Sequence, residues 1–210
     1  MTSWRNAETK KCVIDMMKRY YFIPLLILCV VAAFGTCISV FSVTKDDSDL
    51  PLSPNGTPEI ILHRTGYTSS YNKDTKQPNW VAWHLTKEHV QGTIRRASNA
   101  WQEDTDVPKP RVNSYDYKGS GWSRGHMCPA GDNKWNRDAM YETFLYSNVC
   151  PQHPRLNSGD WNEIEMACRR WAEKYGDVYI VCGHSYDKDM RSLVLAKYLY
   201  QKHSSRWLCV

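Results

Sequence analysis

One stretch of 24 residues, from Tyr20 to Val43, carries no charged side chain and is rich in Leu, Ile, Val, Phe and Ala. As an α-helix it would be about 36 Å long, which is enough to cross a hydrocarbon core of roughly 30 Å. A buried helix of this length in a globular protein would normally show a polar face, and this stretch shows none. We therefore predict that residues 20–43 form a transmembrane helix or a signal segment.

The charges on either side of this run predict its orientation. Five cations lie in the basic N-terminus, residues 1–19, whereas three aspartates follow the run between residues 46 and 49. Because Lys and Arg gather on the cytoplasmic side of membrane spans, we expect the rest of the chain to be anchored outside the cytoplasm, in a periplasmic or extracellular space. A cleaved signal peptide is the alternative, since translation from Met17 would give a short basic start before the apolar run. The product would then be secreted.

The chain after this run is predicted to be a linker, one domain and a tail. Residues 44–58 contain three prolines, a glycine and several short polar side chains, which is typical of a linker. Residues 59–183 form the predicted domain, and residues 184–210 form a divergent C-terminal tail.

Apolar periodicity within the predicted domain indicates an α+β fold with a central antiparallel sheet. Trp161, Ile164, Cys168 and Trp171 recur every three or four residues, which predicts one apolar face of a helix that ends near Gly176. The other expected elements are short: strands at 59–63, 80–85, 145–149 and 178–181, and helices at 136–144 and 192–202.

The net charge excludes a protein that holds duplex DNA by charge alone. Five of the 27 cations and two of the 22 anions precede the apolar run, which leaves residues 45–210 with a net charge of only about +2. A binder that relies on phosphate neutralisation would be more basic. The composition therefore favours an enzyme with a local cationic cleft.

The eight cysteines do not predict a structural zinc site. No two of them show Cys-x-x-Cys spacing, and five follow the apolar run, where oxidation is permitted. Cys128 and Cys150 each stand beside a candidate site motif, so we expect them to be close in space. They form either a disulfide that braces the site or two small buried thiols.

One segment contains residues suited to the hydrolysis of a phosphodiester. His126, in Ser123-Arg124-Gly125-His126, can accept a proton from water because an imidazole titrates near neutral pH. Asn157 offers an amide oxygen, a hard neutral donor that suits Mg²⁺ or Mn²⁺. A single neutral ligand leaves most of the coordination shell to water and phosphate oxygens.

Glu165 and Arg169 follow Asn157 at a helical spacing. Residues 157, 161, 165 and 169 would share one face of a helix in steps of four. A carboxylate at 165 can orient a metal-bound water, and an arginine at 169 can reach the phosphate. An ordinary surface ion pair is the alternative, and the joint order and spacing with His126 and Asn157 favour the functional interpretation.

The motifs that carry this chemistry lie within residues 59–183. They are Arg64-x-Gly66-Tyr67, Pro78-x-Trp80-Val81-Ala82-Trp83, Asp116-Tyr117-x-Gly119-Ser120-Gly121, Ser123-Arg124-Gly125-His126-Met127-Cys128-Pro129-Ala130-Gly131-Asp132, Glu142-Thr143-Phe144-Leu145-Tyr146-Ser147-Asn148, Pro151-Gln152 and Leu156-Asn157-x-Gly159-x-Trp161-x-x-x-Glu165. Together these motifs resemble the DNA/RNA non-specific endonucleases of the ββα-metal group, a family that includes mitochondrial endonuclease G and secreted bacterial nucleases.

The resemblance implies a magnesium-dependent hydrolase with a ββα-metal fold. His126 would be the general base, Asn157 the direct ligand of Mg²⁺, with Mn²⁺ as a substitute, and Glu165 would hold a metal-bound water. Arg124 and Arg169 would contact the phosphate.

The resemblance also implies a role for Asn148 and a pattern of substrate cleavage. Asn148 would position the histidine or the metal waters. Family members cut both DNA and RNA with little base preference and leave 5′-phosphates, which fits recognition through backbone phosphates.

The chain departs from the family pattern at two places. Ser123 stands where the family motif usually begins with aspartate, which removes a charge beside the site. Beyond Gly183 the family fold continues with several strands, whereas residues 184–210 do not resemble that continuation. We therefore expect a sheet that is incomplete at its C-terminus. The alternative function is a catalytically impaired remnant that at most binds nucleic acid.

Overall fold

The computed structural model describes residues 50–186, 193–201 and 206–209, apart from Pro54, Ala97 and Asn99. The predicted transmembrane or signal segment at 20–43 lies outside these residues, as does the basic N-terminus. In the described part of the chain, no helix is both long enough and apolar enough to span a bilayer. The chain divides between Pro54 and Asn55, and the fold below is that of the second unit.

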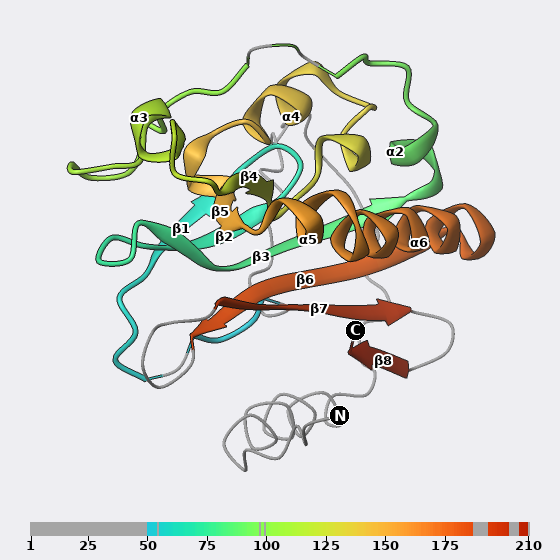
Figure 1. The fold of residues 1–210 in the computed structure, drawn as a ribbon. Helices are drawn as coiled ribbons and strands as arrows, with labels where there is room; N and C mark the ends of the chain where they lie inside the picture. The colour runs from blue at the N-terminus through green and yellow to red at the C-terminus, as the bar shows by residue number, and fades with distance from the viewer. Residues whose placement is uncertain are drawn as a thin grey trace, which may run out of the picture. The chain divides into compact units, whose positions relative to one another are not determined.

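A six-stranded antiparallel sheet forms the centre of this unit, in the order β1-β2-β3-β6-β7-β8 (Figure 1). Its strands are β1 (Ile60–His63), β2 (Thr68–Asn72), β3 (Gln77–Thr86), β6 (Asp177–Tyr186), β7 (Leu193–Gln201) and β8 (Arg206–Cys209). β1 contains all but the first residue of the strand predicted at 59–63, and β3 and β6 contain the strands predicted at 80–85 and 178–181. The predicted α+β class and the central antiparallel sheet are confirmed.

The helix predicted at 192–202 is wrong, because this segment forms strand β7. β7 pairs with β6 from Leu193, opposite Tyr186, to Tyr200, opposite Tyr179. The edge of the long strand β6 offers this segment backbone hydrogen-bonding partners, and such tertiary context outweighs a local helical preference. With β8 paired in turn to β7, the sheet continues by two strands past Gly183.

Helices and a small ribbon lie on one side of the sheet (Figure 1). The helices are α2 (Lys87–Gln91), α3 (Ser114–Tyr117), α4 (Arg137–Glu142), α5 (Pro154–Ser158) and α6 (Asp160–Tyr175), with short 3₁₀ turns at Ala130–Asp132 and Tyr146–Asn148. α4 lies within the helix predicted at 136–144, whereas the sequence did not predict α2.

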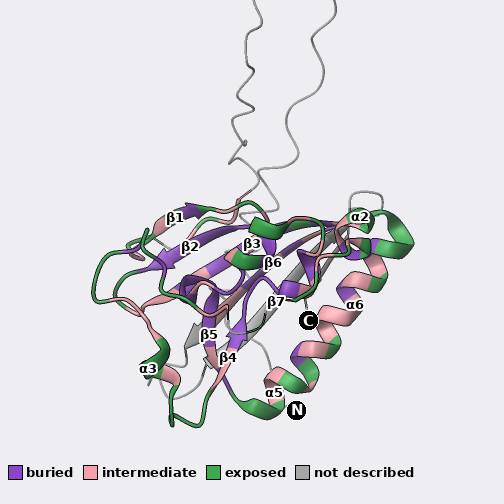
Figure 2. Cartoon of the chain, turned by 90° about the horizontal axis from the view of Figure 1, so that it is seen from above, coloured by how far each residue is buried: buried purple, intermediate pink, exposed green. Residues whose placement is uncertain are grey.

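The longest helix, α6, packs its apolar face on β3 and β6. Trp161, Cys168 and Ala172 are buried in one cluster with alternate residues of the two strands, including Leu85 and Ile180. Figure 2 shows this buried layer between the sheet and the more exposed outer face of α6. The predicted apolar face is therefore confirmed, and each large aliphatic side chain buried here contributes about 1.5–3 kcal/mol.

The end of α6 is also as predicted. Gly176 follows its last residue with φ +96°, a left-handed conformation that L side chains rarely adopt. The chain then turns directly into β6, so this glycine sets the angle between the helix and the sheet.

A two-stranded antiparallel ribbon, β4 (Ser123–His126) with β5 (Val149–Gln152), lies beside α5 and α6. The strand predicted at 145–149 is displaced, because residues 146–148 form a 3₁₀ turn and β5 begins at Val149. Gly125 is required in β4, since a Cβ there would lie 2.1 Å from the side chain of Gln152. That side chain crosses the ribbon at this point, and the glycine gives it room.

Candidate active site

Strand β4 presents Arg124 and His126 on the same face of the ribbon, because alternate residues of a strand point the same way. Both side chains contact Trp101, which comes from the loop after α2. The Arg124 guanidinium lies 4.9 Å from the centre of the indole, and the ring centres of Trp101 and His126 are 4.8 Å apart. Trp101 therefore joins the two residues that the sequence identified as base and phosphate contact.

His126 is 8% exposed and neutral at physiological pH. Burial, and next the positive charge of Arg96, lower the pKa of the imidazole to about 3. Its Nε2 is buried and has no hydrogen-bond partner among the described residues. The backbone carbonyl of His126 accepts a bond of 3.2 Å from Nε1 of Trp161, which ties β4 to α6. The imidazole is thus unprotonated at neutral pH.

Asn148 fixes the backbone that follows His126. Its Oδ1 accepts from the backbone N–H of Cys128 at 2.9 Å, and its Nδ2 donates to the carbonyls of Cys128 and Thr143, each at 2.9 Å. Its own carbonyl accepts from the N–H of Met127 at 2.9 Å. Since both amide protons bind backbone carbonyls, the role that the structure supports is positioning of the histidine through the chain.

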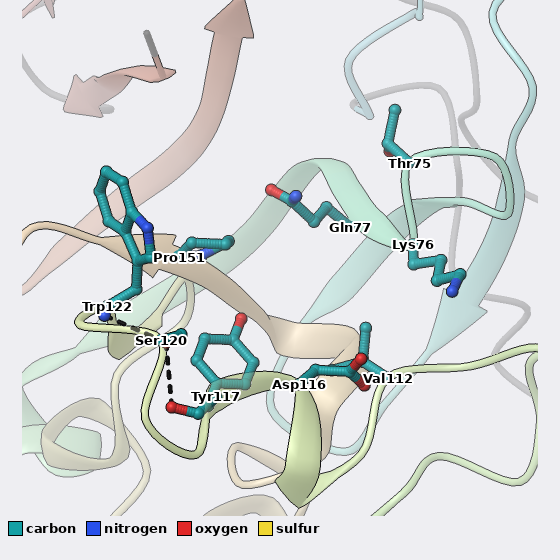
Figure 3. Close-up of a pocket in the computed structure, with 9 residues that line it drawn as sticks. All are labelled: Thr75, Lys76, Gln77, Val112, Asp116, Tyr117, Ser120, Trp122 and Pro151. Carbon is teal, nitrogen blue, oxygen red and sulfur yellow. Dashed lines mark hydrogen bonds between the residues drawn. The ribbon is translucent and has the colours of Figure 1, made fainter. Parts of the chain in front are cut away.

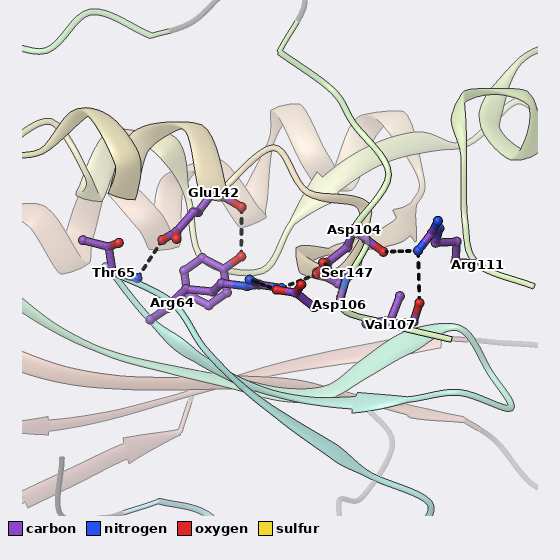
Figure 4. A network of polar contacts seen from close by, with 9 residues as sticks. Arg64, Thr65, Asp104, Asp106, Val107, Arg111, Glu142 and Ser147 are labelled. Carbon is purple, nitrogen blue, oxygen red and sulfur yellow. Dashed lines mark hydrogen bonds and ion pairs between the residues drawn. The ribbon is translucent and has the colours of Figure 1, made fainter. Parts of the chain in front are cut away.

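A second polar network holds the turn that contains Asn148 (Figure 4). The hydroxyl of Ser147 donates to the buried carboxylate of Asp104. Arg64 forms an ion pair of 2.6 Å with the same carboxylate and one of 2.5 Å with Asp106. This network connects the β1–β2 turn to the loop after Trp101 and to the turn that contains Asn148.

Asn157 lies in α5, which is a separate helix from α6. The two helices are separated at Gly159, where a Cβ would lie only 2.5 Å from the carbonyl oxygen of Arg155. The single helical face predicted for residues 157–169 is therefore wrong at its first position. In the described part of the chain, the Asn157 side chain makes no hydrogen bond.

Arg124 and Asn157 line one surface hollow of about 740 Å³, here called the cationic hollow. Its lining residues are polar, aromatic or cationic: Arg96, Trp101, Ser114, Tyr115, Tyr117, Lys118, Trp122, Ser123, Arg124 and Asn157. Three of these are cations and none is acidic, so the hollow concentrates positive charge, whereas residues 45–210 together carry a net charge of only about +2.

Glu165 and Arg169 do not line the cationic hollow. Arg169 forms an ion pair of 2.8 Å with Asp132, whose side chain is fully buried, and lies 3.8 Å from Glu165. The other oxygen of Asp132 accepts a bond of 3.0 Å from Nε1 of Trp83. In this structure Arg169 thus compensates a buried carboxylate.

Sequence reasoning missed four residues with clear roles around the site. Asp132 is the last residue of the motif that begins at Ser123, but the sequence did not indicate that it would form an ion pair with Arg169. Arg96 and Trp101 lie in a polar segment to which no function was assigned, and Lys118 is the variable position of the motif Asp116-Tyr117-x-Gly119. The signal that could have found them is a mixture of cationic and aromatic residues near the histidine motif.

Cys128 and Cys150 are free and buried, so the alternative of two small thiols holds in this structure. Cys150 Sγ lies 3.4 Å from the sulfur of Met127, and Cys128 Sγ accepts a bond of 3.3 Å from Asn133. Burial raises the pKa of Cys150 to about 12, which keeps it protonated and unreactive.

The residues present fit a hard divalent cation through oxygen donors. Within the described residues, no three His, Cys, Asp or Glu side chains cluster as a metal site. The amide oxygen of Asn157 is instead a neutral donor that has no hydrogen-bond partner among the described residues, and it lies at the wall of a hollow large enough for water and phosphate oxygens.

The chain resembles known nucleases over most of its described part. It is 44% identical over 132 residues to the mitochondrial nuclease EXOG of Danio rerio, covering 61% of this chain and 38% of the relative. It is 31% identical over 183 residues to mitochondrial endonuclease G of Bos taurus, covering 86% and 59%. The chain thus spans less than two thirds of the length of each.

The fold is also that of a solved nuclease structure. A chain in the crystal structure of the EndoG/EndoGI complex aligns with a TM-score of 0.62 and 25% sequence identity, covering 71% of both chains. The model of the DNA/RNA non-specific endonuclease family matches residues 51–204, which include β7. This chain belongs to the DNA/RNA non-specific endonuclease family.

Proposed function

We propose that this protein is a metal-dependent, sequence-non-specific nuclease that hydrolyses phosphodiester bonds in DNA and RNA. One observation carries the proposal: a neutral, buried imidazole lies next to a hollow that combines Arg124 with the amide oxygen of Asn157, which has no hydrogen-bond partner among the described residues. Family membership supports it independently. The same arrangement accounts for the base, the phosphate contact and the metal ligand that this hydrolysis needs.

The substrate binds through its phosphates in the cationic hollow. Arg96, Lys118 and Arg124 supply positive charge there, and the lining contains no carboxylate to oppose it. Phosphate contacts of this kind fix the position of a strand without reading its sequence. The hollow therefore suits both DNA and RNA.

His126 acts as the general base. Because its imidazole is neutral, it can accept the proton of the attacking water without first losing one of its own. Trp101 excludes bulk water from one side of the ring, and Asn148 holds the backbone behind it. Arg124 stabilises the negative charge that develops on the phosphate.

Asn157 holds a magnesium ion, for which manganese can substitute. When bound, the ion neutralises phosphate charge and polarises the bond that is cleaved. Glu165 and Arg169 act from α6, and the ion pair between Arg169 and Asp132 holds that helix in place beside the site. In this assignment they support the metal side of the site without lining the cationic hollow.

The nuclease domain lies outside the cytoplasm and is anchored by residues 20–43, or is secreted after their removal. The support for this part of the proposal is the uncharged run and the excess of cations before it. A fusion of a topology reporter after residue 58 tests it, since an external domain makes a periplasmic reporter active and a cytoplasmic one inactive.

The test of the nuclease is cleavage of supercoiled plasmid and of RNA by the full chain in neutral detergent. We expect cleavage with Mg²⁺, none with EDTA, and at least a hundredfold loss in His126→Ala. His63→Ala is the matched control, because this exposed histidine on β1 does not line the hollow. A folded wild-type protein that cleaves neither substrate would leave the catalytically impaired remnant as the correct interpretation.

A further inference from the structure

A surface loop beside the cationic hollow presents two aromatic rings to solvent. This loop, residues 113–122 and here called the finger, contains α3 and leads into β4. Tyr115 is 79% exposed and Trp122 is 51% exposed. Large aromatic rings exposed at the edge of a polar hollow are typical of binding surfaces.

Local hydrogen bonds hold the finger in one conformation. Asn113 caps α3 by accepting from the N–H of Tyr115 at 2.8 Å, and its own N–H donates to Asp116 at 2.8 Å. The Ser120 hydroxyl accepts from the N–H of Trp122 at 3.1 Å and donates to the carbonyl of Tyr117 at 2.9 Å. The backbone that carries the aromatic rings is thus ordered before any ligand arrives, which lowers the entropic cost of binding.

A second hollow, here called the small hollow, lies between the finger and the β2–β3 turn (Figure 3). Its volume is about 180 Å³, below the roughly 300–1,000 Å³ of pockets for drug-sized ligands, so it suits a single ring system. Tyr117 and Trp122 line both hollows. The two hollows therefore adjoin each other at these two aromatic residues.

Two residues that line the small hollow, Thr75 and Gln77, carry buried side-chain oxygen atoms. Thr75 Oγ1 and Gln77 Oε1 are both buried, and neither has a hydrogen-bond partner among the described residues. Figure 3 shows the amide of Gln77 extending toward Trp122 and Pro151. Because an unpaired buried acceptor costs free energy, these atoms favour a ligand that brings an N–H donor.

We propose that the small hollow binds one unstacked nucleobase of the substrate strand. The base stacks on Trp122, and one of its N–H groups donates to Gln77 Oε1 or Thr75 Oγ1. Each of the common bases carries such a donor and has a π-face, so the site holds a base without selecting its identity. The inference rests on the proposed function, because it assigns the base of a strand whose phosphates occupy the cationic hollow.

The test measures binding of the full chain, in EDTA and neutral detergent, to two labelled single strands. One is a twelve-residue oligothymidylate, and the other has the same phosphates but abasic sugars. Since stacking of one base contributes about a tenfold gain or more in affinity, wild type should bind the oligothymidylate at least tenfold more tightly than the abasic strand. Trp122→Ala and Gln77→Leu should each reduce that difference, whereas Tyr175→Ala, a 42% exposed aromatic on α6, should not.

Equal affinity of wild type for the two strands would overturn the inference, as would a folded Trp122→Ala protein that keeps the full difference. The outcome is independent of the nuclease test, because EDTA prevents cleavage. Base-dependent binding without cleavage in Mg²⁺ would contradict the proposed function and support this site. Cleavage without base-dependent binding would support the proposed function and contradict this site.

Discussion

The burial of His126 predicts that the protein loses stability in mild acid. The unfolded chain binds a proton at this imidazole near its ordinary pKa of 6.5, whereas the folded protein resists protonation until about pH 3. Above pH 6.5 the residue is neutral in both states and contributes no pH dependence. Between these two pKa values, each pH unit of acidification favours the unfolded state by about 1.36 kcal/mol. At pH 5 the loss is about 2 kcal/mol.

The assay is urea unfolding of the full chain at pH 7.5 and pH 5, with His126→Asn as the variant. Asparagine is neutral at both pH values, so the variant lacks this contribution. The pKa values of His89 and His184 are also lowered by burial, but both residues are present in both proteins and cancel in the comparison. The wild type should lose about 2 kcal/mol more than the variant between the two pH values.

A pH dependence that is the same in both proteins would refute this reasoning. It would mean that His126 is solvated or charged in the folded protein at pH 5. The assignment of a neutral base held in a buried site would then be wrong, whatever the cleavage assay shows.

Three further predictions concern the scaffold. Gly125→Ala should destabilise the protein by about 1–3 kcal/mol in urea unfolding, because the new Cβ meets Gln152, and adding Gln152→Ala should recover part of the loss. Asp132→Ala should cost about 3–5 kcal/mol, because it removes the 2.8 Å partner of a partly buried arginine and leaves that arginine only Glu165, at 3.8 Å. Asp74→Ala, which breaks an exposed ion pair, should change stability by less than about 1 kcal/mol. The two cysteines considered for a disulfide should react as free thiols when the chain is denatured without reductant, and a missing pair of thiols would contradict the structure.

The local elements of this fold could be predicted from the sequence. The apolar spacing from Trp161 to Trp171 predicted α6, because one helix face packs on the sheet whatever the rest of the chain does. Gly176 marked its end for an equally local reason, a left-handed backbone conformation. The strand motif with His126 could also be located, since its residue order is distinctive.

The non-local features could not be predicted in the same way. β7 is a strand because β6 offers it an edge, and no periodicity within residues 193–201 reveals that partner. Similarly, Arg169 lies against Asp132, 37 residues earlier in the chain, so its spacing from Glu165 did not identify its main contact. The break at Gly159 separates Asn157 from α6 because of a close approach to Arg155 that only the folded backbone shows.

The most direct test of the central claim is a magnesium titration of the cleavage rate on one labelled oligonucleotide, with wild type, His126→Ala and Asn157→Ala. Loss of a general base and loss of a metal ligand change different kinetic quantities. We predict that His126→Ala lowers the rate at saturating Mg²⁺ at least a hundredfold and leaves the half-saturating concentration unchanged, whereas Asn157→Ala raises that concentration at least tenfold. A wild-type rate in His126→Ala, or an unchanged magnesium requirement in Asn157→Ala, would contradict the assignment.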